Sequence, residues 1–253
     1  MISLDRISFQ YPGGQPIFLD FSWQIHAGES WAILGASGCG KTSLLYLLAG
    51  LRRPTSGEIT INDQVLTRPR PSTGLILQDY GLLPWATVQE NVTLGYKVRQ
   101  FYGADGIHAP TVPVKAFSAE EWMERLGIQE AAQQYPSQLS GGQRQRTAIA
   151  RTLSLQPDLL LMDEPFSSLD AVTREDLQAL TIQLTREQNM TSVLVTHSIE
   201  EAALLGRKIL VLGKIPHTQA SIVDNPASGE MDFRQSDSYQ KICLELRARM
   251  DAV

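Results

Sequence analysis

The chain has 253 residues, of which 43% are hydrophobic and 19% are charged, and this balance suits a globular protein with a substantial core. Its formal net charge of -5 gives no general electrostatic reason to bind nucleic acid or an anionic membrane surface, although it allows a local basic patch. The two cysteines, Cys39 and Cys243, lie far apart, which argues against a disulfide framework or a zinc site and fits a reducing compartment.

Membrane-spanning and secretory segments are not expected from the sequence. No apolar run approaches the roughly 18–20 residues that cross a bilayer. The first residues also lack the basic and long apolar regions of a signal peptide. We therefore expect a cytosolic chain, unless another subunit holds it at a membrane.

Strands and helices alternate along much of the chain. Period-two alternation or short apolar runs predict strands at residues 17–25, 30–34, 58–61, 74–77, 159–162, 191–196 and 208–212. Helical spacing and end signals predict helices at residues 41–49, 141–154, 172–188 and 236–250. This alternation predicts an α/β core with a mainly parallel sheet.

The middle of the chain departs from the alternation, because residues 80–153 contain no convincing strand and so predict an inserted helical lobe. Within it, residues 98–118 hold two glycines and two prolines without a clear period, which predicts a loop or insertion. The tail is too short for a large regulatory domain, so none is expected. The predicted divisions are an α/β core at 1–79 and 154–215, a helical subdomain at 80–153 and a tail at 216–253.

Residues 35–42, Gly-Ala-Ser-Gly-Cys-Gly-Lys-Thr, fit the P-loop pattern between a predicted strand and a predicted helix. Glycines let successive backbone N–H groups point at one anion, and the helix that follows adds its positive end. Lys41 would then reach the β and γ phosphates, and Thr42 would offer its hydroxyl to Mg²⁺. The alternative, a glycine-rich turn with an exposed lysine, fits these flanks poorly. Cys39 is interpreted as a small, tolerated side chain within the loop.

Two carboxylates end the apolar strand predicted at residues 159–162. Asp163 can hold Mg²⁺ through its water shell, and Glu164 can orient and deprotonate an attacking water. Alone this would also describe an ordinary strand end, but a P-loop upstream makes it a Walker B pattern.

Between these motifs, residues 139–143 read Leu-Ser-Gly-Gly-Gln. Ser140 is a candidate N-cap, and the two glycines permit close backbone approach. Free N–H groups at this helix start would make a second phosphate site. The alternative is a helix start and nothing more.

Together these motifs resemble the ATP-binding-cassette family, and the resemblance covers almost the whole chain. The family's adenine-stacking aromatic, P-loop, Q-loop glutamine, signature, Walker B pair, D-loop and switch histidine are matched in order by Tyr11, residues 35–42, Gln78, residues 139–143, Asp163 with Glu164, residues 168–170 and His197. The resemblance implies a P-loop core of the RecA type, with an N-terminal antiparallel β subdomain and an inserted α-helical subdomain.

The resemblance also implies Mg²⁺-dependent ATP hydrolysis in a head-to-tail dimer, in which each ATP touches the P-loop of one copy and the signature of the other. The implied catalytic residues are Glu164, His197, Lys41 and Gln78. Those implied for the metal are Thr42, Gln78 and Asp163. The implied nucleotide contacts are Tyr11, Gly35, Ser37, Gly38, Cys39, Gly40, Lys41, Thr42, Ser43, Ser140, Gly141, Gly142 and Gln143. Ser198 follows the histidine where the family often has aspartate, and little effect on hydrolysis is expected.

One compact cassette without zinc-type cysteines favours a transporter subunit whose permease subunits are separate chains. Residues 78–92, which include Trp85, are similar to bacterial importers of the nitrate, sulfonate, taurine and bicarbonate group. We therefore expect the chain to lie at the cytoplasmic face of the inner membrane and to drive import of a small solute. The expected partners are a second copy of the chain, the permease and an external solute-binding protein, and no nucleic acid is expected. A soluble cassette acting on a protein or nucleic-acid complex, or an export or extraction cassette, remains the alternative.

Overall fold

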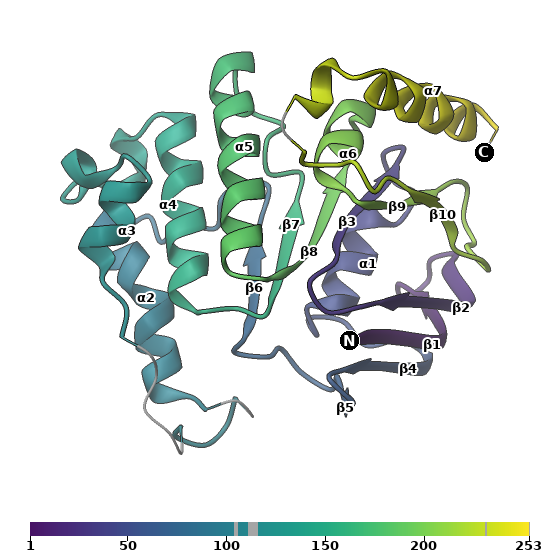
Figure 1. Cartoon of the computed structure of the whole chain (residues 1–253). Coiled ribbons are helices and arrows are strands. Elements are labelled where there is room, and N and C mark those ends of the chain that lie inside the picture. Colours follow the sequence, from purple (N-terminus) through teal and green to yellow (C-terminus); the bar gives the residue numbers. More distant parts are fainter. Residues whose placement is uncertain (104–105, 111–115, 231, 253) are drawn as a thin grey trace. The chain divides into compact units, whose positions relative to one another are not determined.

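The computed structural model describes residues 1–103, 106–110, 116–230 and 232–252 (Figure 1). It contains two compact units, one formed by Met1–Pro69 with Asn189–Val253 and the other by Arg70–Gln188. The division of the sequence into a core, a helical subdomain and a tail uses other boundaries and stays a prediction.

The first unit opens with an antiparallel sheet in the order β2-β1-β4-β5. Its strands are β1 (Ile2–Gln10), β2 (Pro16–Ile25), β4 (Ser56–Ile61) and β5 (Gln64–Val65). Side chains of Ile2, Leu4, Ile59 and Ile61 are buried, because one face of this sheet lies against the core. This sheet is the predicted antiparallel β subdomain.

A second sheet of the same unit holds three parallel strands, β9 (Lys208–Leu212), β3 (Ser30–Gly35) and β8 (Thr191–Thr196). The short strand β10 (Ser221–Asp224) pairs with β9 in the antiparallel sense. Because β10 lies within the polar segment predicted as a tail, that segment is partly sheet rather than only tail and helix.

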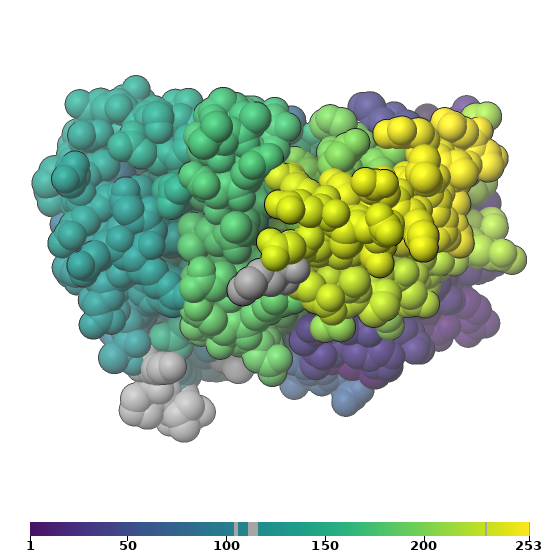
Figure 2. Space-filling view, turned by 45° about the horizontal axis from the view of Figure 1, so that its top comes forward, coloured from purple at the N-terminus to yellow at the C-terminus, as the bar shows by residue number. Residues whose placement is uncertain are grey.

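Helices α1 (Lys41–Leu48) and α6 (Ile199–Leu205) pack on this sheet, and α7 (Asp237–Asp251) packs on α6 and β9. Beneath α7 lies an apolar cluster that includes Leu34, Val211 and Leu246. Figure 2 shows α7, in yellow, covering the surface of this part of the unit. The C-terminal helix therefore closes the core of the first unit.

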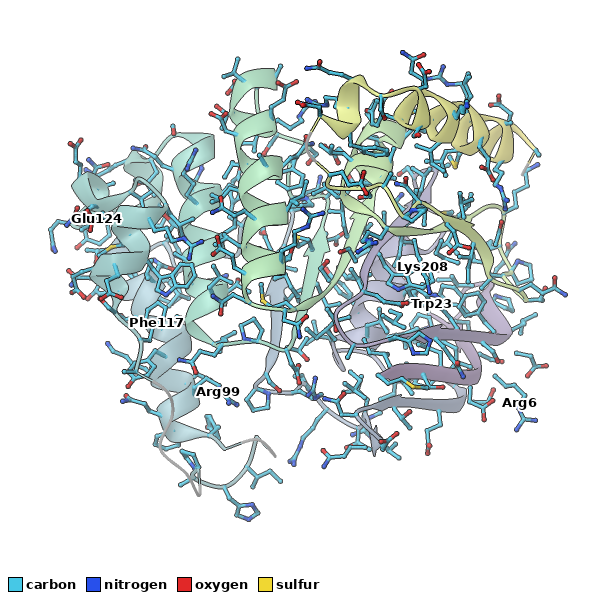
Figure 3. All side chains as sticks on the ribbon, in the orientation of Figure 1. Arg6, Trp23, Arg99, Phe117, Glu124 and Lys208 are labelled. Carbon is cyan, nitrogen blue, oxygen red and sulfur yellow. The ribbon has the colours of Figure 1, made fainter. Side chains whose placement is uncertain are left out.

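An aromatic pair joins the two sheets of the first unit. The Trp23 ring of β2 meets the Trp31 ring of β3 edge to face, with 5.0 Å between centroids. The Lys208 ammonium, labelled in Figure 3, lies 5.4 Å from the Trp31 centroid and bonds Glu29 at 2.6 Å. Burial alone would raise the pKa of Glu29. Hydrogen bonds from Lys208, the His26 N–H and Trp31 outweigh this effect and lower the pKa.

The second unit contains the parallel strands β6 (Thr73–Ile76) and β7 (Leu159–Asp163) and a set of neighbouring helices. The helices are α2 (Val88–Phe101), α3 (Ala119–Arg125), α4 (Gly141–Ser154) and α5 (Ala171–Glu187), with short 3-10 turns at Gln129–Ala131 and Pro136–Gln138. Gly95 lets α2 approach α4, since a Cβ there would lie 2.6 Å from the Arg151 carbonyl oxygen. Among the described residues of 80–153 there is no strand, as predicted.

One expectation is partly wrong, because α2 continues to Phe101 and so residues 98–101 are helical rather than loop. A capping box at Thr87 and Glu90 starts this helix firmly. Of the rest of the expected loop, residues 102–103, 106–110 and 116–118 are irregular, and residues 104–105 and 111–115 lie outside the described residues.

Candidate nucleotide site

The predicted P-loop follows β3 and leads directly into α1 in the first unit. Gly38 and Gly40 have φ of 79° and 103°, in the region that favours glycine. At Gly35, a Cβ would lie 2.6 Å from both the Cys39 Sγ and the Leu212 carbonyl oxygen. Both kinds of constraint require glycine where the pattern predicts it.

Lys41 is 5% exposed, and its ammonium is held inside the curve of the loop. Its Nζ donates to the carbonyl oxygens of Gly35 and Ala36, each at 2.9 Å. The charge is therefore placed within the loop, where an anion bound by the loop amides would meet it. Thr42, on the same first turn of α1, is exposed.

Cys39 is buried, and its Sγ faces Gly35 inside the loop. Burial raises the pKa of this thiol, although the Lys41 charge acts in the opposite direction. An interpretation of Cys39 as a small packed side chain agrees with this geometry.

Tyr11 follows β1 and lies beside the start of α1. Its hydroxyl is 3.2 Å from the Ser43 Oγ, and the Arg52 guanidinium lies over its ring, 5.6 Å from the centroid. An aromatic ring backed by a cation suits contact with a flat base on its other face. The geometry thus brings together the predicted residues Tyr11 and Ser43, and it adds Arg52, which the sequence did not single out.

His197 lies at the same sheet edge as the P-loop. Leu34 of β3 pairs with Thr196 of β8, so Gly35 and His197 continue from paired positions. Ser198 caps α6, because its Oγ accepts the Glu201 N–H at 3.2 Å. Serine in place of the family's aspartate therefore has a clear local role.

In the second unit, Asp163 ends β7 and is buried, and Glu164 follows it with a φ of 44°. That conformation is uncommon for a residue with a side chain. The Glu164 carbonyl oxygen accepts bonds from the Ser167 N–H at 3.3 Å and its Oγ at 3.0 Å. A tight turn therefore fixes the backbone of Glu164 at the strand end.

Gln78 lies near this carboxylate edge as well. Ile76 of β6 pairs with Met162 of β7, so Gln78 continues opposite Glu164, two positions beyond the pair in each strand. The structure thus brings the predicted Q-loop glutamine and catalytic carboxylate to one edge of the β6–β7 pair.

The predicted signature begins α4. Ser140 is its N-cap, with the Gln143 N–H donating to the Ser140 Oγ at 3.2 Å and the Ser140 N–H donating to the Gln143 Oε1 at 2.9 Å. A Cβ at Gly142 would lie 2.7 Å from the Thr173 methyl, so any other residue there would require this side chain to move. The exposed hydroxyl of Ser140 and the first amides of α4 form a helix start open to an anion.

A tyrosine that the sequence did not single out connects three of these motifs. The Tyr80 hydroxyl lies 2.7 Å from the Ser168 Oγ, and the Arg144 guanidinium lies over its ring. A Cβ on Gly141 would lie 3.6 Å from the Tyr80 hydroxyl. The Q-loop, the D-loop and the signature helix therefore meet around Tyr80.

Each unit carries groups whose chemistry suits part of a nucleotide complex. Loop amides with an enclosed ammonium suit phosphates, and an aromatic ring suits a base. In the first unit the Thr42 hydroxyl, and in the second unit the Asp163 carboxylate and the Gln78 amide, are oxygen donors of the kind that Mg²⁺ prefers. Fold and site thus define a P-loop α/β protein that binds nucleotides.

Comparison with known proteins gives the family. The family model "ABC transporter" matches residues 18–167, and the chain therefore belongs to the ABC transporter family. Over 82% of this chain, it is 41% identical to the taurine import ATP-binding protein of Pelagibacter ubique, of which it covers 76%. It is also 41% identical to the nitrate import ATP-binding protein of Synechococcus elongatus over 83% of this chain. The chain spans only 31% of that second relative's length.

Solved structures agree with the fold. A dimeric ATP-binding cassette in a post-hydrolysis state bound to ADP and Pi matches with a TM-score of 0.73 and 28% identity, covering 88% of this chain and 98% of the other. A dimeric bacterial ABC transporter cassette matches with a TM-score of 0.72 and 31% identity over the same shares. The predicted family, fold class and ATP-binding subunit of an ABC transporter are confirmed, and the soluble and export alternatives are not supported.

Proposed function

We propose that the chain is the Mg²⁺-dependent, ATP-hydrolysing subunit of an importer for a small solute of the nitrate, sulfonate or taurine type. The observation that carries the proposal is its 41% identity to a taurine import ATP-binding protein over most of both chains. Permease subunits would hold the chain at the cytoplasmic face of the membrane, and an external binding protein would deliver the solute. Within the described residues, no helix is long and apolar enough to span a bilayer.

At the P-loop, the amides of residues 38–42 and the Lys41 ammonium would bind the β and γ phosphates. Gly35 permits the close packing of this loop, and Cys39 packs within it. Ser37 would contact the phosphates as part of the loop, and Ser43 would help to orient Tyr11 against the adenine. Magnesium, when bound, would neutralise the negative charge of the phosphates. Thr42, Asp163 and Gln78 would hold it.

Glu164 would orient the attacking water and accept its proton, while His197 would hold the γ-phosphate end in place. The strained backbone of Glu164 supports this assignment, since residues in such conformations concentrate at functional sites. In a head-to-tail dimer, Ser140, Gly141, Gly142 and Gln143 of a second copy would contact the same γ-phosphate.

Hydrolysis by the purified chain tests these roles. We expect Glu164→Gln to lower kcat at least about a hundredfold, because a general base contributes that much, while ATP affinity is kept. Glu124→Gln is the matched control, since Glu124 is exposed on α3 (Figure 3). Wild-type turnover by Glu164→Gln, or equal losses in both variants, would show that Glu164 is not the catalytic base.

A further inference from the structure

A buried histidine from a distant segment touches the outer side of the P-loop. His217 lies in the connection between β9 and β10 and is 7% exposed. Its Nε2 lies 2.7 Å from the Cys39 carbonyl oxygen. Because a carbonyl oxygen only accepts hydrogen bonds, Nε2 carries the proton and donates it.

The position of His217 is itself fixed by strand β2. Its N–H donates to the Ile17 carbonyl oxygen at 2.8 Å, and its carbonyl oxygen accepts the Leu19 N–H at 3.0 Å. Its ring packs on the fully buried Phe18, with 5.4 Å between centroids. The histidine therefore links the antiparallel sheet to the P-loop.

The geometry of the peptide group carries this contact to the phosphate side of the loop. The Cys39–Gly40 peptide is trans, so its carbonyl and its N–H point in opposite directions. Holding the Cys39 carbonyl outward therefore turns the Gly40 N–H inward. Without the His217 contact, the Cys39–Gly40 peptide could rotate easily, because glycine, with a φ of 103° here, has little steric restraint.

We propose that His217 is a positioning residue for nucleotide binding, which orients the Gly40 amide toward the β and γ phosphates. The inference deepens the proposed function at the P-loop and rests on it only for the binding of ATP. His217 does not touch the nucleotide itself. It acts through one backbone carbonyl.

The test compares His217→Leu, which removes the donor, with His217→Gln, whose amide nitrogen reaches the place of Nε2. In the nucleotide-free protein, we expect amide hydrogen exchange of residues 36–42 to accelerate in the leucine variant and to stay near wild type in the glutamine variant. The dissociation constant of ATP should rise about tenfold in the leucine variant, as expected for one bond to a charged group. The glutamine variant should stay within about twofold.

Asn225→Leu is the matched control for loss of a buried donor in the same unit. The Asn225 Nδ2 donates to the Ala203 and Gly206 carbonyl oxygens at 2.7 and 2.8 Å. It lies near Ser30 at the other end of β3, to which it is joined through Arg207. This control should destabilise the fold without changing exchange in the loop.

Unchanged loop exchange and ATP affinity in His217→Leu would overturn the proposal, as would an equal loss in Asn225→Leu. If the leucine variant does not fold, His217→Asn takes its place, because its shorter amide does not reach Cys39. Equal ATP affinity of the asparagine and glutamine variants would then overturn the proposal. None of these measurements needs a permease, so failure of the importer proposal would leave their outcome intact.

Discussion

At the residue scale, the site depends on backbone positions as much as on side chains. The sequence identified Glu164 and Gly40, but not that Glu164 has a φ of 44° or that His217 supports the loop beside Gly40. A motif specifies residue types at a local spacing, so it predicted the P-loop and the Walker B pair. It holds no information on a contact such as His217 to Cys39, which joins residues 178 positions apart.

Cys39 gives a prediction at this scale. Because the thiol is buried and burial raises its pKa, we expect slow labelling by a maleimide, with a rate that still rises above about pH 9 as the thiolate forms. ATP should slow the labelling further, and a labelled loop should not bind ATP, because the adduct would displace Gly35. Peptide mass spectrometry of the labelled protein measures both effects.

Cys243 serves as the internal control, since it is more exposed and lies in α7. Its labelling should be faster and independent of ATP. Labelling of Cys39 at full occupancy without loss of ATP binding would place the thiol outside the phosphate loop.

At the scale of elements, a side chain of α4 stabilises the Q-loop turn at Tyr80 and Gly81. The Arg151 guanidinium donates to the Tyr80 carbonyl oxygen at 3.2 Å and also to that of Gly81. Burial lowers the Arg151 pKa, while Asp79 acts against this. Tyr80 and Gly81 both have positive φ, a backbone conformation that few residues favour. Two hydrogen bonds from the planar Arg151 guanidinium stabilise this turn.

We expect Arg151→Met to lower the free energy of unfolding by about 2–4 kcal/mol, because two partly buried carbonyls lose a charged donor. Arg151→Lys should recover less than half of the loss, since an ammonium does not reproduce the planar fork. Urea unfolding measures both values. A methionine variant as stable as the wild type would show that the Q-loop does not depend on α4.

The elements themselves were largely predictable. Every strand and helix predicted from periodicity is present, with ends within two residues of the prediction. Strands β1, β5 and β10 and helix α6 were not predicted. Strand β10 has only four residues, of which only Val223 is buried. Residues 98–101 at the end of α2 were missed because they show no clear period and only continue a helix that begins at Val88.

At the scale of the whole molecule, the described site residues are divided between the two compact units. Tyr11, the P-loop and His197 belong to the first unit, and Gln78, the signature and the Walker B pair belong to the second. The proposed completion of the site by a second copy is in line with the dimeric cassettes among similar structures.

Nucleotide-dependent dimerisation of the chain tests whether a second copy completes the site. With Mg²⁺ and ATP, Glu164→Gln should become a dimer by light scattering, because ATP persists and holds both copies. Adding Ser140→Asp should keep it a monomer, since aspartate also caps a helix but repels a phosphate. A dimer that forms equally with Ser140→Asp would show that the signature does not contact the partner's nucleotide.

The central claim is that this chain drives a membrane importer, and co-purification from detergent-solubilised membranes of its source tests it most directly. We expect a polytopic permease to elute with the tagged chain in stoichiometric amount. Trp85→Ala should lose it, because Trp85 is 73% exposed and lies in residues 78–92, the segment that resembles bacterial importers and would dock on the permease. Val65→Ala, an exposed apolar control on β5, should retain it. Recovery of only soluble proteins or nucleic acid under several mild detergents would contradict the account.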